Sequence, residues 1–291
     1  MNSEISYVEW SNLSARARFG VKAMYANGHG PDFFCSSPQH HVYVALEGQT
    51  PIAALATERL DEGTDRVIRL RHEAYRNRHV FHGLMNRLLH KLSRESVQET
   101  MVLLQVVHDE DQDKLNLFTS LGFDPYHTSF NYVLPLVPYE KATFDHWKLS
   151  VVDPSNYATW LHHRNEHALV LPDVFPLTEE RLRRFLARNH CCYTLHRKGK
   201  AVGIFRAHYH QDCVMIHEIH LFEQEEVTQE AIPFLQRTFC HQLKPSRRLR
   251  LTVTSLQPDL QYAIIKQEAV AKQSAFYTMT NILPARAARF N

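Results

Sequence analysis

The sequence predicts two tandem α/β units joined by a short linker. In each half, short apolar runs typical of strands alternate with segments whose apolar residues repeat at the helical period. The same order of elements recurs in the second half at an offset of about 145 to 151 residues. Corresponding positions are Gly48 and Gly199, Met101 and Leu249, and Phe130 and Ala275. An offset kept over this length indicates an internal duplication.

The composition is that of an ordinary folded protein. Hydrophobic residues make up 44% of the 291 residues and charged residues 22%, which is too apolar for a disordered chain. The formal net charge of +2 and the pI of about 8.3 argue against a dedicated nucleic-acid-binding protein. No run of 18 apolar residues is present, so we expect no membrane span. Five scattered cysteines without a secretion signal predict reduced thiols and a cytoplasmic protein.

The first half contains strand and helix patterns in a regular order. The predicted elements are a strand at 4–8, a helix at 11–25, hairpin strands at 42–46 and 52–57, a strand from 67, a helix through 92, a strand at 101–107, a helix at 111–121 and a strand at 130–136. Gly48 suits the hairpin turn, and Gly122 suits the end of the last helix. The run at 101–107 is almost wholly apolar, as in a strand that is buried on both faces.

A basic segment, Tyr75 to Phe81, separates the strand that starts at Val67 from the next helix, and it is predicted to be a loop. The helix that follows shows one apolar face, formed by Leu84, Met85, Leu88, Leu89 and Leu92. A loop between a strand and a helix leads to a helix N-terminus, where unpaired backbone N–H groups favour anions. The basic segment is therefore the main candidate for anion binding.

The second half repeats this order. Its predicted elements are a strand at 148–152, helices at 154–167 and 178–189, a hairpin that turns at 197–200, a strand at 214–222, a helix at 232–243, a strand at 249–253, a helix at 258–267 and a strand at 276–280. Pro135 and Pro138 mark the boundary between the halves. We therefore predict domains at residues 1–137 and 148–291, with a linker at 138–147.

The order of elements in the first half resembles that of the GCN5-related N-acetyltransferase (GNAT) superfamily. Residues 68–89 are similar to that family's acetyl-CoA-binding segment, Arg/Gln-x-x-Gly-x-Gly/Ala between a strand and a helix, and residues 117–123 are similar to its late helix. The resemblance implies an α/β (α+β) protein of two tandem GNAT-like units, each a mixed, mostly antiparallel sheet flanked by helices. The second half matches in the order of elements, without a phosphate-loop motif.

The resemblance also implies which residues meet acetyl-CoA. Backbone groups of Leu70, Arg71 and His72 would pair with the pantetheine arm, and the pyrophosphate would lie at the start of the helix. The residues implied there are Arg76, Asn77, Arg78, His79, Val80 and Phe81. His79 and Phe81 stand at the two glycine positions of the motif, so arginine side chains would hold the anion in place of close backbone contacts.

Acyl transfer to an amine needs a base, and two carboxylates are candidates. The family often uses a carboxylate on the strand before the phosphate loop, which here implies Glu73. In the second half, Glu218 and His220 share one face of a strand and suit a proton relay. Phe118 stands where many family members carry a proton-donating tyrosine, and Tyr126 or Tyr132 are the candidates to replace it.

A metal site is an alternative interpretation of the hairpin that turns near Gln211. His208, His210 and His217 would fall on one face there, with Cys213 close by, and such ligands suit zinc. No C-x-x-C or H-E-x-x-H spacing supports it, so we predict no metal.

Three functions fit the sequence. The first is an N-acyltransferase that moves acetyl from acetyl-CoA to a primary amine of a small molecule or an amino-acid-like substrate. The second is a catalytically inactive GNAT-fold module for binding or assembly, which the missing glycines and Phe118 favour. The third is a transferase with another acyl donor, an aminoacyl-tRNA or a carrier-protein thioester. We expect a small-molecule amine as partner, with neither membrane nor nucleic acid, and the sequence leaves a homo-oligomer open.

Overall fold

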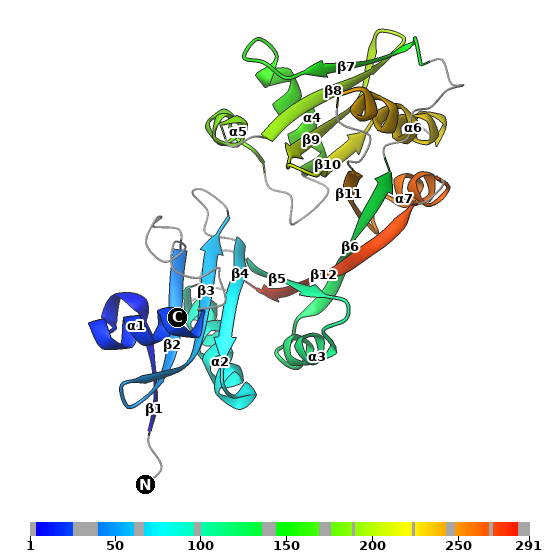
Figure 1. The fold of residues 1–291 in the computed structure, drawn as a ribbon. Coiled ribbons are helices and arrows are strands. Elements are labelled where there is room, and N and C mark those ends of the chain that lie inside the picture. The colour runs from blue at the N-terminus through cyan, green and yellow to red at the C-terminus, as the bar shows by residue number, and fades with distance from the viewer. Residues whose placement is uncertain are drawn as a thin grey trace, which may run out of the picture. The chain divides into compact units, whose positions relative to one another are not determined.

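The chain divides into two compact units in the computed structural model (Figure 1). The structure describes residues 4–25, 40–60, 67–95, 100–135, 144–168, 176–187, 190–222, 225–242, 248–267 and 270–284. Unit 1 comprises residues 1–126 and 277–291, and unit 2 comprises residues 127–276. Within the described residues, no helix is both long and apolar enough to span a membrane.

Unit 1 begins with a hairpin-rich sheet and two covering layers of helix. Its elements are β1 (Ile5–Glu9), the 3-10 helix η1 (Trp10–Asn12), α1 (Ala15–Met24), β2 (His40–Glu47), β3 (Thr50–Arg59), β4 (Val67–Tyr75), α2 (Arg78–Glu95), β5 (Met101–His108), α3 (Gln112–Ser120), the start of β6 (Asp124–Pro135) and the end of β12 (Ala271–Leu283). The strand order is β1-β2-β3-β4-β5-β12. The β1–β2, β2–β3 and β3–β4 pairs are antiparallel, and the β4–β5 pair is parallel.

The helices of unit 1 cover opposite faces of its sheet. Buried residues of α1 pack with Val42, Val44 and Ala54 of the central strands. Buried residues of α2 and α3 pack instead with Tyr43, Ala45 and other side chains that alternate with the first set. Both faces of the sheet are apolar, and α1 and α2 each pack their buried side chains against one of them.

Unit 2 is built in the same way. Its elements are most of β6, then β7 (Trp147–Val151), α4 (Tyr157–Ala168), α5 (Glu179–Leu186), β8 (His190–Arg197), β9 (Lys200–Tyr209), β10 (Cys213–Leu221), α6 (Glu225–Gln242), β11 (Arg248–Thr254), α7 (Pro258–Ile265) and the first part of β12. The strand order is β12-β6-β11-β10-β9-β8-β7. The β10–β11 pair is parallel, and β10–β9, β9–β8, β8–β7 and β11–β6 are antiparallel.

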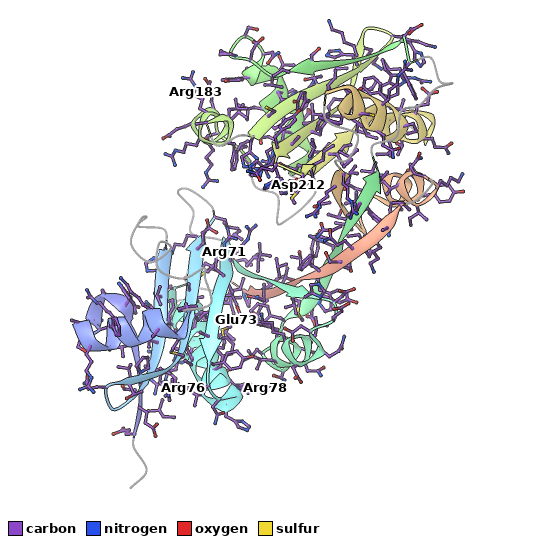
Figure 2. The ribbon with its side chains drawn as sticks, viewed as in Figure 1. Arg71, Glu73, Arg76, Arg78, Arg183 and Asp212 are labelled. Atoms are coloured by element: carbon purple, nitrogen blue, oxygen red, sulfur yellow. The ribbon has the colours of Figure 1, made fainter. Side chains whose placement is uncertain are left out.

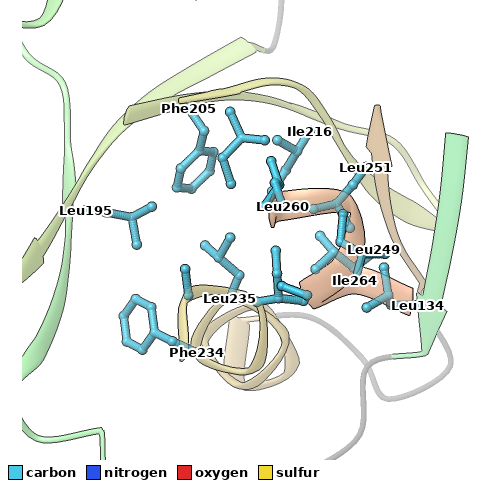
Figure 3. Close-up of a cluster of buried hydrophobic side chains, with 14 of the residues drawn as sticks. Leu134, Leu195, Phe205, Ile216, Phe234, Leu235, Leu249, Leu251, Leu260 and Ile264 are labelled. Atoms are coloured by element: carbon cyan, nitrogen blue, oxygen red, sulfur yellow. The ribbon is translucent and has the colours of Figure 1, made fainter. Parts of the chain in front are cut away.

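A large apolar cluster holds α6 and α7 against the sheet of unit 2 (Figure 3). Leu235 of α6 and Ile264 of α7 are fully buried against strand residues that include Leu195, Phe205 and Leu249. A smaller cluster on the other face holds α4 and α5 through Trp160 and Leu182 and the partners they share. The predicted fold class, tandem units with mixed, mostly antiparallel sheets flanked by helices, is confirmed.

The last strand of each half is counted with the other compact unit. From residue 127 onward β6 belongs to unit 2, where Leu134 joins the apolar core. From residue 277 onward β12 belongs to unit 1, where Met279 is fully buried. The predicted domain boundaries at 137 and 148 describe the repeat along the sequence and stay a prediction. The predicted linker lies partly outside the described residues.

The predicted loop at Tyr75–Phe81 is wrong. β4 continues through Tyr75, which pairs with Ala53 of β3, and α2 already begins at Arg78. Only Arg76 and Asn77 connect the two elements. The helix starts this early because the Asn77 side chain caps it: Asn77 Oδ1 accepts from the His79 backbone N–H at 2.8 Å.

Candidate active site

The site in unit 1 begins with an irregularity in β4. Pairing with β3 shifts register between Leu55 and Thr57, so that Leu55 faces Glu73 while Thr57 faces Leu70. Three steps along β4 thus oppose two steps along β3, which is a β-bulge at Arg71 and His72. A bulge redirects the side chains that follow it, and Glu73 is the first of these.

β4 and β5 separate next to this bulge (Figure 1). Their parallel pairing covers only Val67–Arg69 of β4 and Val102–Leu104 of β5. Both strands continue beyond these pairs, to Tyr75 and His108, through residues that the structure describes throughout. The edge of β4 from Leu70 onward is therefore available for backbone hydrogen bonds to a ligand.

Glu73 is nearly buried at the open end of the two strands. Its side chain is 6% exposed and forms an ion pair with Lys114 of α3. Burial and the Glu73 carboxylate together raise the pKa of the Tyr25 phenol. Burial alone would lower the pKa of Lys114, but the charge of Glu73 raises it above its ordinary value. The open end of the two strands therefore brings together the Glu73 carboxylate and the Lys114 ammonium group.

Figure 2 follows the basic segment along unit 1 from Arg71 through Glu73 to Arg76 and Arg78. Arg71 Nε contacts Glu58 Oε2 at 2.6 Å, so this guanidinium is already paired. Arg78 makes only a long 3.9 Å contact with exposed Asp113, and Arg76 is exposed. Two of the three predicted arginines therefore remain accessible to an anion at the start of α2.

Phe81 plays a different part from its neighbours in the predicted cofactor segment. Its side chain is fully buried, stacks on Tyr75 at 4.7 Å between ring centroids, and meets Phe118 edge-on at 6.4 Å. Phe118 is also fully buried and packs on Phe123. The aromatic side chain at the second glycine position thus anchors α2 in the core and points away from the helix N-terminus.

The remaining predicted residues differ in exposure and in location. Leu70 is buried at 2% exposure, His79 is exposed and Val80 is half-buried. The His72 side chain lies outside the described residues. Tyr132 packs in the core of unit 2, where its hydroxyl accepts a hydrogen bond from Gln261 Nε2 at 3.1 Å. The expectation that Tyr132 could replace Phe118 in unit 1 is therefore wrong.

Unit 2 repeats the geometry with another chemistry. β10 pairs with β11 only over Cys213–Ile216, and a bulge at His217 precedes Glu218. Glu218 thus occupies in β10 the place that Glu73 occupies in β4. In sequence, both are preceded by histidine, as His72-Glu73 and His217-Glu218, and the two pairs stand 145 residues apart (218 − 73), within the range of the repeat offset. This His-Glu pair was the signal that would have identified the two carboxylates as equivalent.

Arginines enclose Glu218. Arg164 Nη2 lies 3.0 Å from Glu218 Oε1, Arg206 Nε lies 3.4 Å from Oε2, and His220 Nε2 lies 3.8 Å from Oε1. Burial alone would raise the pKa of Glu218, but His220 and the two guanidinium groups hold it at about 2. A carboxylate with this pKa is a weak base, so the arrangement favours an ion-pair role for Glu218 over the predicted proton relay.

Four histidines gather on the same sheet near Glu218. The rings of His190 and His208 stack at 4.3 Å, His208 and His210 lie 4.1 Å apart, and His217 lies 6.1 Å from His190. The predicted clustering of His208, His210 and His217 is therefore present. Across the described part of the chain, however, no group of three or more His, Cys, Asp or Glu side chains is placed to hold a metal ion.

Known structures share this architecture. A tandem GNAT protein from the clavulanic acid biosynthesis pathway, solved without acetyl-CoA, is 13% identical with a TM-score of 0.59, over 96% of this chain and 99% of that one. A GCN5-related N-acetyltransferase from Sphaerobacter thermophilus is 11% identical with a TM-score of 0.59, over 97% of each chain. One from Anabaena variabilis is 14% identical with a TM-score of 0.60, over 96% of this chain and 73% of that one.

The chain has the tandem GNAT fold. No family model matches the sequence, and no curated protein matches it. The GNAT fold is therefore carried here by the order and pairing of the elements at very low sequence identity.

The residues of unit 1 fit the acetyl-CoA that the GNAT fold implies, with one change in how the phosphates are met. The open edge of β4 suits the amide-rich pantetheine arm. At the start of α2, the Asn77 side chain already occupies the His79 N–H. Fewer backbone donors remain for a pyrophosphate, so Arg76 and Arg78 would carry more of its charge.

Proposed function

We propose that unit 1 is an N-acyltransferase that moves acetyl from acetyl-CoA to a primary amine of a small or amino-acid-like acceptor. The observation that carries this proposal is the divergence of β4 from β5 beside the buried carboxylate of Glu73. The divergence offers backbone groups to an extended donor, and the carboxylate lies where β4 opens. Acetyl-CoA supplies the thioester that is attacked.

Glu73 is the base in this proposal. An amine attacks only when it is deprotonated, and a carboxylate can take its proton directly or through a water molecule. The ion pair with Lys114 orients the Glu73 carboxylate. As the new amide bond forms, the C–S bond of the thioester breaks and CoA leaves as a thiolate. Phe118 has no proton to give, so the thiolate takes its proton from water, and Lys114, one helical turn before Phe118 on α3, supplies positive charge on this helix.

Arg76 and Arg78 hold the donor phosphates, together with the first turn of α2. Leu70 to His72 present the backbone for the pantetheine arm. In sequence, the corresponding segment of the second unit reads Glu223-Gln224-Glu225-Glu226 and contains no arginine. An acidic segment repels phosphate, so unit 2 is proposed to bind no donor.

The test is product formation. The full chain is incubated with acetyl-CoA and a panel of primary amines and amino acids, and acetylated products are measured by mass spectrometry. We expect one class of amine to be acetylated, and Glu73→Gln to lower kcat by about 100-fold, as for loss of a general base, with the KM for acetyl-CoA unchanged. Glu180→Gln, at an exposed position of α5, is the matched control and should keep the full rate.

A second candidate is an inactive GNAT-fold module for binding or assembly. It is favoured by the Asn77 cap on the His79 N–H and by the buried Phe118. Absence of product from acetyl-CoA, together with absence of acetyl-CoA binding, would favour it. Transfer from an aminoacyl-tRNA or a carrier-protein thioester would instead give product only with those donors.

A further inference from the structure

Unit 1 contains a cavity that is separate from the diverging strands. It lies between the edge strand β1, its neighbour β2 and the C-terminal half of α2, with a volume of about 370 Å³. Pockets that bind small molecules have volumes of about 300 to 1,000 Å³. The cavity is therefore of a size that holds a small molecule.

Tyr7 lies against α2 at a glycine. A Cβ atom built at Gly83 would meet the Tyr7 hydroxyl, so a larger residue at this position would shift the tyrosine side chain. Leu84, the next residue of α2, and Leu88, one turn after it, are buried and form an apolar floor. Gly83, which stands too late to serve in a phosphate loop, thus shapes this second site.

Two tyrosine rings line the cavity, and each carries a cation on its face. The Arg87 guanidinium lies 5.1 Å from the ring centre of Tyr7, and Lys91 Nζ lies 5.2 Å from that of Tyr43. Flat aromatic walls accept a flat ring, because offset or edge-to-face ring contacts are favourable beyond the area that they bury.

The charge around the cavity is positive. Arg87, Lys91 and Arg94 face Glu9 and Glu95, which leaves one excess positive charge before His90 is counted. The two carboxylates are already engaged: Glu9 pairs with Lys91, and Glu95 lies 3.8 Å from Lys91 Nζ and 3.7 Å from Arg59.

Arg87 and Arg94 have no carboxylate within ion-pair distance among the residues that the structure describes. They stand seven positions apart on α2, so both project from the same side of the helix. Each guanidinium can therefore pair with an acidic group of a bound molecule without breaking an existing ion pair.

We propose that this cavity binds a small aromatic anion, a molecule with a planar ring system and one carboxylate or sulfonate group. The ring packs on Leu84 and Leu88 beside Tyr7 and Tyr43, and the acidic group pairs with Arg87 or Arg94. The site uses the far end of α2 from Arg76 and Arg78, so its occupation does not require an acyl donor.

Calorimetric titration of the full chain with three naphthalene probes tests this proposal. The probes share one ring system and differ in charge: naphthalene-2-sulfonate, 2-naphthalenemethanol and 2-naphthylmethylammonium. We expect saturable one-to-one binding of the sulfonate, at least tenfold tighter than that of the alcohol, and no binding of the ammonium. Arg87→Ala with Arg94→Ala should weaken sulfonate binding at least tenfold and leave acetyl-CoA affinity unchanged.

Two further variants separate the site from general charge effects. Glu9→Gln removes a carboxylate from the rim and releases Lys91, so it should strengthen sulfonate binding by about threefold. Arg16→Ala, at an exposed position of α1 on the opposite face of the sheet, changes the net charge as Arg87→Ala does and should leave binding unchanged.

The proposal is overturned if the sulfonate fails to bind, if the alcohol binds equally well, or if the double arginine variant binds as tightly as the parent chain. It is also overturned if Arg16→Ala weakens binding as much as Arg87→Ala, since the effect would then report net charge alone. Circular dichroism on each variant establishes that the fold is retained.

Discussion

Glu73 of unit 1 and Glu218 of unit 2 stand at equivalent places and are held differently. Each follows a bulge on a strand that diverges from its parallel neighbour. Glu73 pairs with Lys114, a flexible side chain that is 29% exposed. Glu218 is enclosed by Arg164 and Arg206, whose side chains are 10% and 19% exposed. The same backbone thus supports a carboxylate that one lysine holds in unit 1 and a carboxylate that two arginines hold in unit 2.

After a duplication, two copies of a fold can share a backbone geometry and differ in the side chains around it. The bulge and the divergence are properties of strand pairing, and both units have them. The chemistry depends on which side chains contact the carboxylate. In unit 1 the partner is Lys114 of α3, whereas in unit 2 the partners are Arg164 of α4 and Arg206 of β9. Bidentate-capable arginines order a carboxylate more strongly than a lysine does. Unit 2 therefore has the same bulge and strand divergence as unit 1, and its carboxylate, Glu218, forms ion pairs with Arg164 and Arg206.

The largest expected effect is on the stability of unit 2. Arg164→Ala leaves Glu218 with one arginine, and removing one partner of an ion pair whose side chains are only 10% and 16% exposed costs about 3 kcal/mol of unfolding free energy. Lys114→Ala in unit 1 should cost about 1 kcal/mol, because the lysine side chain is 29% exposed and its removal opens Glu73 to water. Urea denaturation of both variants measures the contrast. Equal losses would contradict the difference between the two carboxylates.

The next effect is a loss of stability in acid, for which His217 of unit 2 has the largest pKa shift among the histidines that the structure describes. Burial and the charge of Arg206 lower the pKa of His217 to about 4 from 6.5, with the neighbouring His190, His208 and His210 acting in the same direction. The unfolded chain therefore binds a proton that the folded chain does not bind, so stability is complete above pH 6.5 and falls between about pH 6.5 and 4. Because the imidazole is only partly buried and solvent screens its charge, we expect this loss to be roughly 2 kcal/mol.

Below this range Glu218 adds a second loss. Its folded pKa of about 2 lies under the ordinary 4.5, so its stabilisation is present above pH 4.5 and is lost as the pH falls toward 2. Thermal melts from pH 8 to 2 measure both ranges. His217→Leu should reduce the slope between pH 6.5 and 4 and leave the lower one, and a parent chain with a flat profile in both ranges would refute the assignment.

A smaller effect is expected where unit 1 departs from the usual GNAT pattern. Phe118→Tyr restores the tyrosine of the family, but the ring is fully buried against Phe81 and Phe123. A hydroxyl buried there without a partner should cost about 1 kcal/mol of unfolding free energy and give no gain in rate. Melting temperature and initial rate are the two measurements. A faster enzyme would show that the cleft reaches this position.

Much of the fold could be predicted because local sequence patterns determine where its strands, helices and turns lie. Apolar alternation and turn glycines located the hairpins, and Gly48, Gly122 and Gly199 do have positive φ. The Thr178 cap and the repeat offset were also readable, since Thr178 Oγ1 accepts from the Arg181 N–H.

The rest depends on contacts that no local pattern encodes. Which sheet the end of β12 joins is decided by tertiary packing of residues such as Met279. The early start of α2 was missed because Arg76 to His79 is polar and reads as a loop until the Asn77 cap is recognised. Lys114, the partner of Glu73, lies 41 residues away along the chain (114 − 73), so sequence spacing did not indicate it.

The number of acetyl-CoA molecules that the chain binds tests most directly whether unit 1 alone holds the acyl donor. Calorimetric titration of the full chain should give one site per chain. Arg76→Ala with Arg78→Ala should weaken it at least tenfold, while Arg183→Ala, an exposed arginine of unit 2, should leave it unchanged. Two sites per chain, or a single site that is insensitive to Arg76 and Arg78, would contradict the claim that the diverging strands of unit 1 alone hold the acyl donor.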